Sequence, residues 1–416
     1  MVERSIGMGM SVPARFLTTA ALLMLSGCSS PSSPARPTTT PTPTPSLVTA
    51  PPPTPTPTQT ATPAPAPTPA VLTAASIQPE SVTFTSPDDG WVLGLSECGH
   101  VTCLRLAKTA DAGRTWTWVS SDNLSTIAVT DQWQLRFADS DDGWISGPRL
   151  YSTHDAGRTW TRVSVPGLVG PNSSVSALAV ADGRVYAEIT EALDANTNGP
   201  VVLFGSRTNV DAWYSVPSVS TGANGFAGNI SVAQGALWLS LHPAIVTADG
   251  NESLSTLYRS LDGVNWRSEP QPCPPGTVAT VGAATSTRVF VLCSGGFAAG
   301  SQSKNAYVSE NDGATYERVA DPPFGGDFND LEASPTSVSV DASSGASAID
   351  TSFDNGHTWT TTLGIGDGGL GVMDVGFTTS TQGVAIHGRI DYPDSLQLFM
   401  TRDGGHHWAA VAVNPS

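Results

Sequence analysis

The sequence predicts an all-β protein, a seven-bladed β-propeller of four-stranded antiparallel blades, with six or eight blades as alternatives. Three observations predict this fold class. Glycine is abundant (41 of 416 residues) and charged residues make up only 13%, which suits a chain rich in turns. A short motif recurs seven times after residue 100. Its copies begin 43 to 54 residues apart, which is the length of one four-stranded blade.

The motif has the form Ser/Thr-x-Asp-x-Gly-x-Thr-Trp, and the copies at 109–116, 153–160, 352–359 and 401–408 keep it closely. The copies at 260–266 and 309–316 vary, and the one at 206–213 is degenerate. We expect the Asp to accept backbone N–H groups in a tight turn, the Gly to adopt a backbone conformation that other residues resist, and the aromatic residue to pack between blades. The structural residues predicted in this way are Asp111, Gly113, Trp116, Asp155, Gly157, Trp160, Asp262, Trp266, Asn311, Gly313, Tyr316, Asp354, Gly356, Trp359, Asp403, Gly405 and Trp408.

Segments typical of strands flank each copy in a fixed order. An apolar run comes first, then a strand that begins with Gly-Trp at 90–91 and 143–144, then a third strand leading into the motif and a fourth leaving it. This order predicts blades near 77–120, 129–165, 174–217, 227–271, 276–320, 327–364 and 370–414.

These motifs resemble the Asp-box (BNR) repeats that also occur in the sialidase superfamily. With a Gly-Trp strand before the box, the whole pattern is similar to the photosystem II stability/assembly-factor-like propellers. The resemblance covers nearly all of residues 76–416 but lies in architectural residues, so it implies the fold. The photosynthetic member of that family is an assembly chaperone with a basic patch. This chain is acidic and has only two lysines, Lys108 and Lys304, so that role is not carried over.

Residues 1–27 have the pattern of a lipoprotein signal peptide. Arg4 and Arg15 give a positive start, and residues 16–25 form an apolar run too short to span a membrane as a mature helix. The sequence LSGC at 25–28 resembles the lipobox of bacterial lipoproteins, which implies cleavage before Cys28 and a diacylglycerol on its thiol. The alternative is an ordinary secretory signal with an incidental cysteine. Met8 and Met10 leave the true start residue open.

Residues 28–75 are expected to be the lipidated cysteine followed by a disordered Pro/Thr-rich stalk. Fifteen prolines occur between residues 31 and 69, alternating mostly with Thr and Ala, a composition that favours extended polyproline II and cannot form a core. Some 40 such residues reach on the order of 120 Å when fully extended. Together the signal, the cysteine and the stalk predict a lipid-anchored protein on the extracytoplasmic face of the cell membrane, with the propeller at 76–416.

Cysteine usage agrees with export. Once Cys28 carries lipid, an even number remains, with Cys98 and Cys103 across a short predicted hairpin and Cys273 and Cys293 within one repeat. No paired C-x-x-C spacing typical of a metal site occurs, so two local disulfides, Cys98–Cys103 and Cys273–Cys293, are predicted. No metal or cofactor is expected, because the motif aspartates are committed to turns and do not have the spacing of calcium ligands.

The formal net charge of −17 argues against nucleic acid and anionic lipid head groups as partners of the folded part. We expect a monomer that contacts the membrane through its lipid alone. The protein or glycan partner is not identified by the sequence.

Catalytic residues of a sialidase are not evident. Such an enzyme needs three arginines around the substrate carboxylate, yet Arg136 alone is placed on a predicted innermost strand. Tyr151, Tyr258 and Tyr307 share the same slot just before a motif, and a position repeated from blade to blade is structural. The histidines decorate motif turns or are isolated, and no Gly-x-Ser-x-Gly elbow occurs.

Other glycosidases need only two carboxylates at a suitable separation. Candidates in or near predicted connections are Asp327, Asp330, Glu332, Asp367 and Asp374, and no spacing singles out a pair. No catalytic residue is therefore assigned. The favoured function is a non-enzymatic binding or scaffold module for a protein or glycan partner at the cell envelope. The alternative is an extracytoplasmic glycan-active hydrolase, sialidase-like or another glycosidase, on the same propeller.

Overall fold

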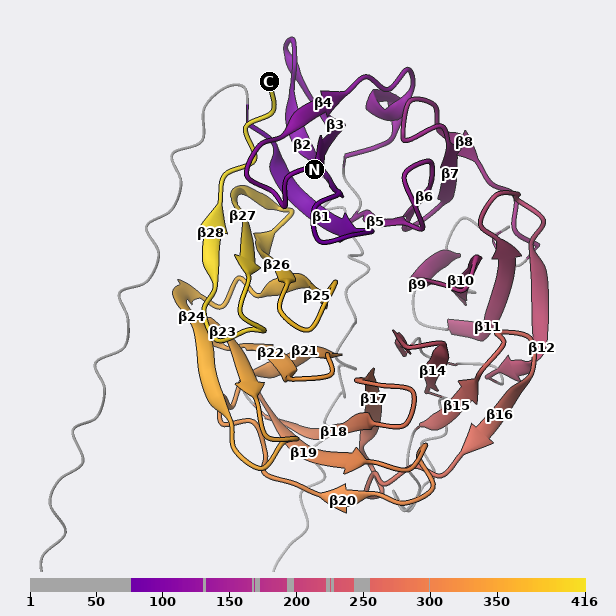
Figure 1. Ribbon diagram of the computed structural model, residues 1–416, viewed down its shortest axis with the longest axis vertical. Helices are drawn as coiled ribbons and strands as arrows, with labels where there is room; N and C mark the ends of the chain where they lie inside the picture. Colours follow the sequence, from indigo (N-terminus) through magenta and orange to yellow (C-terminus); the bar gives the residue numbers. More distant parts are fainter. Residues whose placement is uncertain are drawn as a thin grey trace, which may run out of the picture. The chain divides into compact units, whose positions relative to one another are not determined.

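Each blade is formed by one contiguous stretch of chain that folds into four antiparallel strands. In the computed structural model seven such sheets surround one axis, with the first strand of each blade innermost (Figure 1). The predicted fold class is therefore confirmed. The structure describes residues 76–416 except 130–131, 167, 169–172, 193–197, 222–224, 226–227, 243–254 and 299. The predicted signal peptide, Cys28 and the proline-rich segment lie outside the described residues.

The strands follow one another from the inside of each blade outward, in chain order. Blades 1 to 3 contain β1 (Gln78–Phe84), β2 (Gly90–Cys98), β3 (Val101–Thr109), β4 (Thr117–Val119); β5 (Gln134–Phe137), β6 (Asp142–Ser146), β7 (Leu150–His154), β8 (Thr161–Arg162); and β9 (Ser174–Ala181), β10 (Arg184–Ala192), β11 (Asn198–Arg207), β12 (Tyr214–Ser220). Blades 4 and 5 contain β13 (Ile230–Ala233), β14 (Ala236–Leu241), β15 (Thr256–Ser260), β16 (Trp266–Glu269); and β17 (Val278–Ala283), β18 (Val289–Ala298), β19 (Ser301–Ser309), β20 (Glu317–Arg318). Blades 6 and 7 contain β21 (Asp327–Ala333), β22 (Val338–Ser343), β23 (Gly345–Ser352), β24 (Thr360–Gly368); and β25 (Val372–Phe377), β26 (Gly383–Arg389), β27 (Tyr392–Thr401), β28 (Ala409–Val411).

The apolar core is divided among the junctions between neighbouring blades. The described residues form seven buried clusters, and each cluster joins side chains of two adjacent blades. The second strand of a blade, such as β2 or β14, is a nearly continuous run of apolar residues because a neighbouring blade covers each of its two sides. Trp91, Trp144 and Trp238 on these strands are almost completely buried. The fold is therefore stabilised at every junction around the ring.

The two ends of the described chain meet at the junction of blades 7 and 1. The amide of Ile77 donates to the carbonyl of Val413 (3.1 Å), and the amide of Ser416 donates to the carbonyl of Trp116 (3.1 Å). Strand β1 also contacts β25, β26 and β27. These contacts close the ring.

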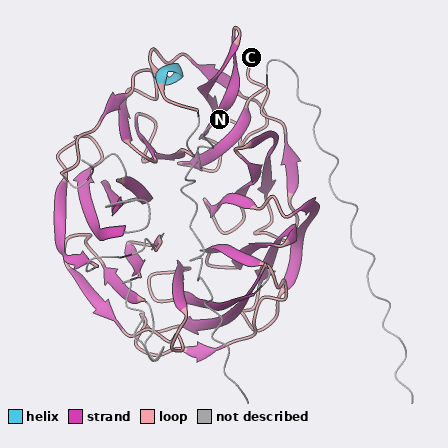
Figure 2. Cartoon of the chain, turned by 180° about the vertical axis from the view of Figure 1, so that it is seen from behind, coloured by secondary structure: helices cyan, strands magenta, loops and turns pink. Residues whose placement is uncertain are grey.

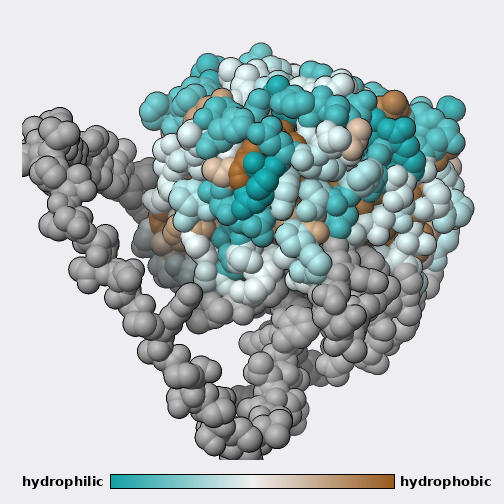
Figure 3. Space-filling view, turned by 90° about the horizontal axis from the view of Figure 1, so that it is seen from below, coloured by the Kyte–Doolittle hydropathy of each residue, from teal (hydrophilic) through white to brown (hydrophobic). Residues whose placement is uncertain are grey.

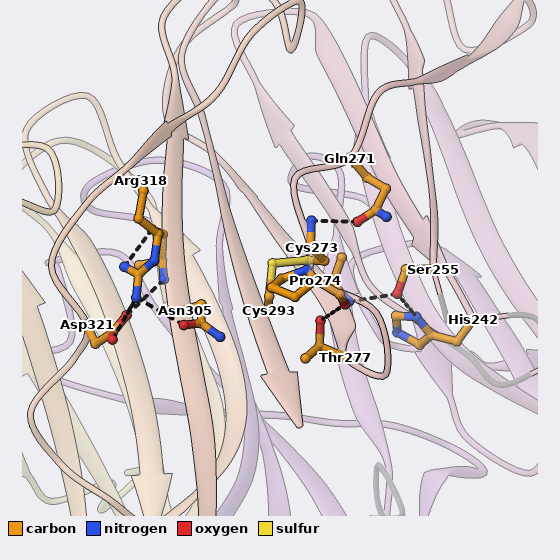
Figure 4. Close-up of a disulfide and its surroundings, with 12 residues drawn as sticks. His242, Ser255, Gln271, Cys273, Pro274, Thr277, Cys293, Asn305, Arg318 and Asp321 are labelled. Carbon is orange, nitrogen blue, oxygen red and sulfur yellow. Dashed lines mark hydrogen bonds and ion pairs between the residues drawn. A yellow bond between two sulfur atoms is a disulfide. The ribbon is translucent and has the colours of Figure 1, made fainter. Parts of the chain in front are cut away.

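Strand direction divides the turns between two faces of the propeller. The turns between first and second strands and between third and fourth strands lie at one end of each blade, which we call the turn face. The turns between second and third strands and the connections from one blade to the next lie at the other end, the connection face. Both predicted disulfides, Cys98–Cys103 and Cys273–Cys293, are formed, and both lie at the connection face. Figure 4 shows Cys273–Cys293 and its surroundings.

Helix is confined to one turn in the described part of the chain, the 3₁₀ helix η1 (Leu124–Thr126) in the connection from blade 1 to blade 2 (Figure 2). Among the described residues no helix is long and apolar enough to cross a bilayer. Figure 3 shows a face on which hydrophilic side chains predominate and hydrophobic ones are scattered. The large hydrophobic residues that are exposed are Val101, Val210, Leu261, Val264 and Tyr392.

Candidate functional site

The motif turns are organised by two side chains. In blade 1 the Thr109 hydroxyl accepts from the amide of Gly113 (2.9 Å) and donates to Asp111 (2.8 Å), whose carboxylate accepts from the amide and hydroxyl of Thr115 (2.8 and 2.6 Å). Hydrogen bonds from Thr115 hold the pKa of Asp111 at about 2. Asp155, Asp354 and Asp403 accept from the amide four residues on, and Asn311 and Asp262 make the corresponding bonds in their variant turns.

Two successive residues of each full-length turn adopt positive φ. The motif glycine is one, as in Gly113 (φ 77°) and Gly157 (φ 85°), but the residue before it is another, as in Ala112 and Ala156 (both φ 62°). The glycine also lies against the preceding blade, where a Cβ on Gly157 would collide with Leu106. Conformation and close approach therefore both require glycine there, whereas the sequence analysis identified only the first reason.

The motif aromatic residues pack against the blade that precedes them. Trp116 contributes to a cluster with Ile386 and Leu398 of blade 7, and Trp160 to one with Leu104 and Leu106 of blade 1. The same placement holds for Trp266, Tyr316, Trp359 and Trp408. In the degenerate copy, Trp213 packs against blade 2, and the Ser206 hydroxyl accepts from the amide of Ala212 (3.1 Å). The motif aromatic residues therefore join neighbouring blades.

A charged cluster lies on the innermost strands around the axis. Arg136 on β5 makes a two-point ion pair with Asp374 on β25 (3.2 and 3.3 Å), and Asp374 also accepts from the Ser81 hydroxyl on β1 (2.8 Å). Burial opposes the charge of Arg136, but the charge of Asp374 and the hydrogen bonds to it raise the pKa of the guanidinium. The pair therefore links blades 2, 1 and 7.

Two further carboxyl groups belong to this cluster. Burial raises the pKa of Asp330 to about 6, and the charge of Asp374 adds to the shift. Burial and the nearby Asp330 carboxyl raise the pKa of Glu332 well above its usual range. The sequence predicts Asp327, Asp330, Glu332, Asp367 and Asp374 in or near connections, and Asp327 and Asp367 do lie at the ends of β21 and β24. Asp330, Glu332 and Asp374 lie instead within β21 and β25, where the adjacent apolar residues Leu331 and Val375 are buried between blades.

Two buried glutamates were not identified from the sequence. Glu80 on β1 is 1% exposed, neither of its carboxyl oxygens has a hydrogen-bond partner among the described residues, and burial raises its pKa to about 8. Glu188 on β10 is fully buried and accepts from the amide of Gly228 (3.2 Å). Burial raises its pKa to about 8 although hydrogen bonding lowers it. Both are therefore uncharged near neutral pH.

Of the histidines outside the motif turns, His242 and His387 are buried members of local networks, whereas His100 is exposed. His387 bonds through Nε2 to Asp367, which also accepts from the Ser347 hydroxyl (2.7 Å). His242 Nδ1 lies 2.8 Å from the Ser255 hydroxyl, and burial lowers the pKa of His242 to about 4 (Figure 4). Within the described ranges no group of three or more His, Cys, Asp or Glu side chains could hold a metal ion.

An open groove of about 450 Å³ lies on the turn face between blades 6 and 7. Phe353 of blade 6 and His406 of blade 7 stack in parallel with ring centroids 3.6 Å apart, and the Thr336 hydroxyl donates to the carbonyl of Ser380 (2.9 Å). The groove is lined by Pro335, Thr336, Phe353, Asn355, Ser380, Thr381, Asp403, Gly404 and His406. No motif in the sequence indicated it, because its walls come from four separate turns.

No protein-family model matches the sequence, and no curated protein matches it. Solved structures of similar fold include YCF48 bound to a D1 peptide (18% identity, TM-score 0.49), with 79% of this chain and 94% of that chain covered. YCF48 from Cyanidioschyzon merolae is 15% identical (TM-score 0.48), with 80% and 97% covered. A Hadza microbial sialidase is 12% identical (TM-score 0.40), with 81% and 66% covered. At these identities the likeness concerns the fold.

Proposed function

We infer that this protein is a non-catalytic binding module, a propeller that offers a surface to a protein or glycan partner at the outer face of a cell membrane. Lipid on Cys28 and the Pro/Thr-rich segment would hold it there. Export is also consistent with the two disulfides, which persist in oxidising compartments.

The observation that carries the non-catalytic part is the pairing of Arg136. It is the sole arginine on the seven innermost strands, and both ends of its guanidinium are bound to Asp374. Asp374 is in turn held by the Ser81 hydroxyl. A guanidinium neutralised in this way is not available to bind a substrate carboxylate, so a sialidase reaction at the axis is disfavoured. Arg136 and Asp374 instead form contacts that join blades 2, 7 and 1.

The test is to incubate the purified full chain with neutral and sialylated oligosaccharides and to measure both their retention and the release of reducing sugar. A binding module retains some of them or a protein partner and releases no sugar. Sugar release that disappears in the Glu332→Gln variant would contradict the proposal.

Membrane placement has its own test. Cys28→Ser should move the protein from the membrane fraction to the soluble fraction, because one thiol carries the whole anchor. The control Ser46→Ala changes the proline-rich segment and should leave the protein in the membrane fraction. A Cys28→Ser protein that stays with the membrane refutes the lipid anchor.

The second candidate is a glycan-active hydrolase, and one observation favours it. Glycosidases pair a carboxyl group that stays protonated with one that is ionised. Asp330 and Glu332 have raised pKa values, while Asp374 is bound to Arg136. The same sugar-release assay decides between the two functions.

A further inference from the structure

We propose that the groove between blades 6 and 7 binds a neutral saccharide. This inference rests on the proposed function, because it names a ligand class for the binding module. Three observations support it: the shape of the groove, its stacked aromatic pair, and a lining that has hydroxyl, amide and carboxylate groups but no Lys or Arg.

The side-chain contacts that bridge neighbouring blades at the turn face differ from one junction to the next. At the junction of blades 7 and 1, Arg402 and Gln382 reach across to backbone carbonyls (2.6 and 2.8 Å). At the junction of blades 5 and 6, Arg288 reaches the carbonyl of Pro335 (3.3 Å) and Asn355 reaches Glu310 (3.3 Å). Among the residues that line the groove, the contacts across the junction of blades 6 and 7 are the Thr336–Ser380 hydrogen bond and the ring stack, while Trp408–Thr362 (3.3 Å) and His387–Asp367 join the two blades elsewhere. The volume of about 450 Å³ lies within the range of small-ligand sites.

The aromatic pair supplies a flat surface of fixed orientation. Phe353 and His406 stack with an interplanar angle of 6°, so each ring restrains the other, and both line the groove. An aromatic surface fixed in this way loses little conformational freedom on binding. The C–H face of a pyranose ring is apolar and can pack on it, while the ring's hydroxyl groups remain directed elsewhere.

The remaining lining supplies hydrogen-bonding groups without positive charge from Lys or Arg. Ser380 and Thr381 carry hydroxyls at the groove, and the Thr336 hydroxyl, which donates to the Ser380 carbonyl, can still accept. The Asn355 side chain donates to Glu310 and can offer its amide oxygen as an acceptor. Asp403 is ionised, because hydrogen bonds from His407 outweigh burial and hold its pKa at about 2. Hydroxyl groups can donate to this carboxylate, whereas an anionic ligand is repelled by it. A neutral polyol ring fits this set of groups.

A peptide fits less well. Extended peptides add to an exposed strand edge through backbone hydrogen bonds, but the walls here are four turns. The amides of Gly404 and Thr381 in these walls already bond to the Thr381 carbonyl (2.8 Å) and the Thr379 hydroxyl (3.2 Å). A proline-rich peptide, which needs no such pairing, is therefore kept as the competing ligand in the test.

The experiment is calorimetric titration of the full chain in detergent. The neutral probes are cellotetraose, mannotetraose and chitotetraose, the anionic probe is sialyllactose, and the peptide probe has the sequence of residues 51–69. At least one neutral probe should bind, and Phe353→Ala and His406→Ala should each weaken it about tenfold. Phe353→Tyr, which keeps a ring, should stay within about twofold of the original affinity.

Matched controls occupy the same motif slots in other blades. Leu261→Ala corresponds to Phe353 and His357→Ala to His406, and neither should change the affinity. Circular dichroism and the thermal midpoint establish that each variant is folded.

The outcomes are distinct. Failure of all neutral probes at millimolar concentration, preference for sialyllactose or for the peptide, or affinity that survives both alanine substitutions overturns the saccharide site. Those results leave the proposed binding function to its own test. Binding at the groove followed by sugar release supports the site and overturns the non-catalytic function.

Discussion

The turn face and the connection face of this propeller are built in opposite ways. At the turn face one arrangement is repeated: in six blades a Ser or Thr hydroxyl accepts from the motif glycine amide at 2.8–2.9 Å. At the connection face the stabilising contacts differ between blades. Disulfides are found at blades 1 and 5, and the buried Lys304 donates to the carbonyls of Phe324 and Gly326 (2.9 and 2.6 Å). The repeated motif therefore specifies the structure of the turn face, while the residues and contacts of the connection face vary from blade to blade.

The largest expected effect that tests this difference between the faces is the pH dependence of the free energy of unfolding. Carboxyls of the turn face, such as Asp111 and Asp403, have lowered pKa values, whereas Glu80 and Glu188, nearer the connection face, have pKa values raised to about 8. Between pH 4.5 and 8 the unfolded state ionises these glutamates and the native state does not. The free energy of unfolding should therefore fall by up to about 1.4 kcal/mol per pH unit for each glutamate.

Urea unfolding at pH 5 and at pH 8 measures this loss. Glu80→Gln with Glu188→Gln should reduce the pH dependence above pH 4.5, since neither glutamine titrates, and the part that remains should come from Asp330 and Glu332, whose pKa values are also raised. The turn-face contribution should be lost only at lower pH, as acid protonates the aspartates below about pH 4. A double variant as pH-sensitive as the original would break the assignment of the buried charges.

Removing a disulfide should destabilise the connection face. Cys273→Ser with Cys293→Ser should cost about 3 kcal/mol, because the closed loop spans 20 residues. The pair Cys98→Ser and Cys103→Ser closes only 5 residues and should cost about 2 kcal/mol. Chemical denaturation measures both, and equal losses would mean that loop closure is not the source of the stabilisation.

A turn-face substitution should cost less. Asp111→Ala removes the acceptor of the Thr115 amide and hydroxyl and should lower the free energy of unfolding by about 1–2 kcal/mol, as for a lost side-chain cap. Arg114→Ala, whose exposed side chain reaches only the carbonyl of Asp111, should stay within about 0.5 kcal/mol of the original. Equal effects of the two substitutions would show that the carboxylate does not organise the turn.

The smallest effect concerns the strained residue before the motif glycine. Ala156 adopts φ 62°, so Ala156→Gly should stabilise the protein by about 0.5 kcal/mol. Ala110→Gly, outside the positive-φ pair, should destabilise it by a similar amount. Thermal midpoints resolve the two signs, and a loss in both variants would argue against strain at this position.

Much of the fold could be predicted because its determinants are local. Thr109, Asp111 and Gly113 lie within five positions of one another, so one sequence window specifies the turn, and seven windows specify the ring. The disulfides are local for the same reason, with separations of 5 and 20 residues.

The axial cluster and the groove could not be predicted in this way. Arg136 and Asp374 are 238 positions apart, and they meet because the ring places blades 2 and 7 on either side of blade 1. Phe353 occupies a motif slot where other blades carry Ala, His, Arg, Leu or Glu, and His406 occupies one where blades 1, 2, 5 and 6 carry Arg, Arg, Ala and His. Their stacking depends on which residue faces them from the adjacent blade. Contacts of this kind follow from closure of the ring and are not encoded in any single repeat.

The closure at Ile77 and Val413 also bears on circular permutation. Every sheet is built from contiguous chain, and the junction of blades 7 and 1 is joined by side chains reaching carbonyls, as other junctions are. No strand is exchanged across it. A chain cut in another connection, with residue 416 linked back to residue 76, would therefore retain all seven sheets. The position of the chain ends is therefore not required by the arrangement of the seven blades.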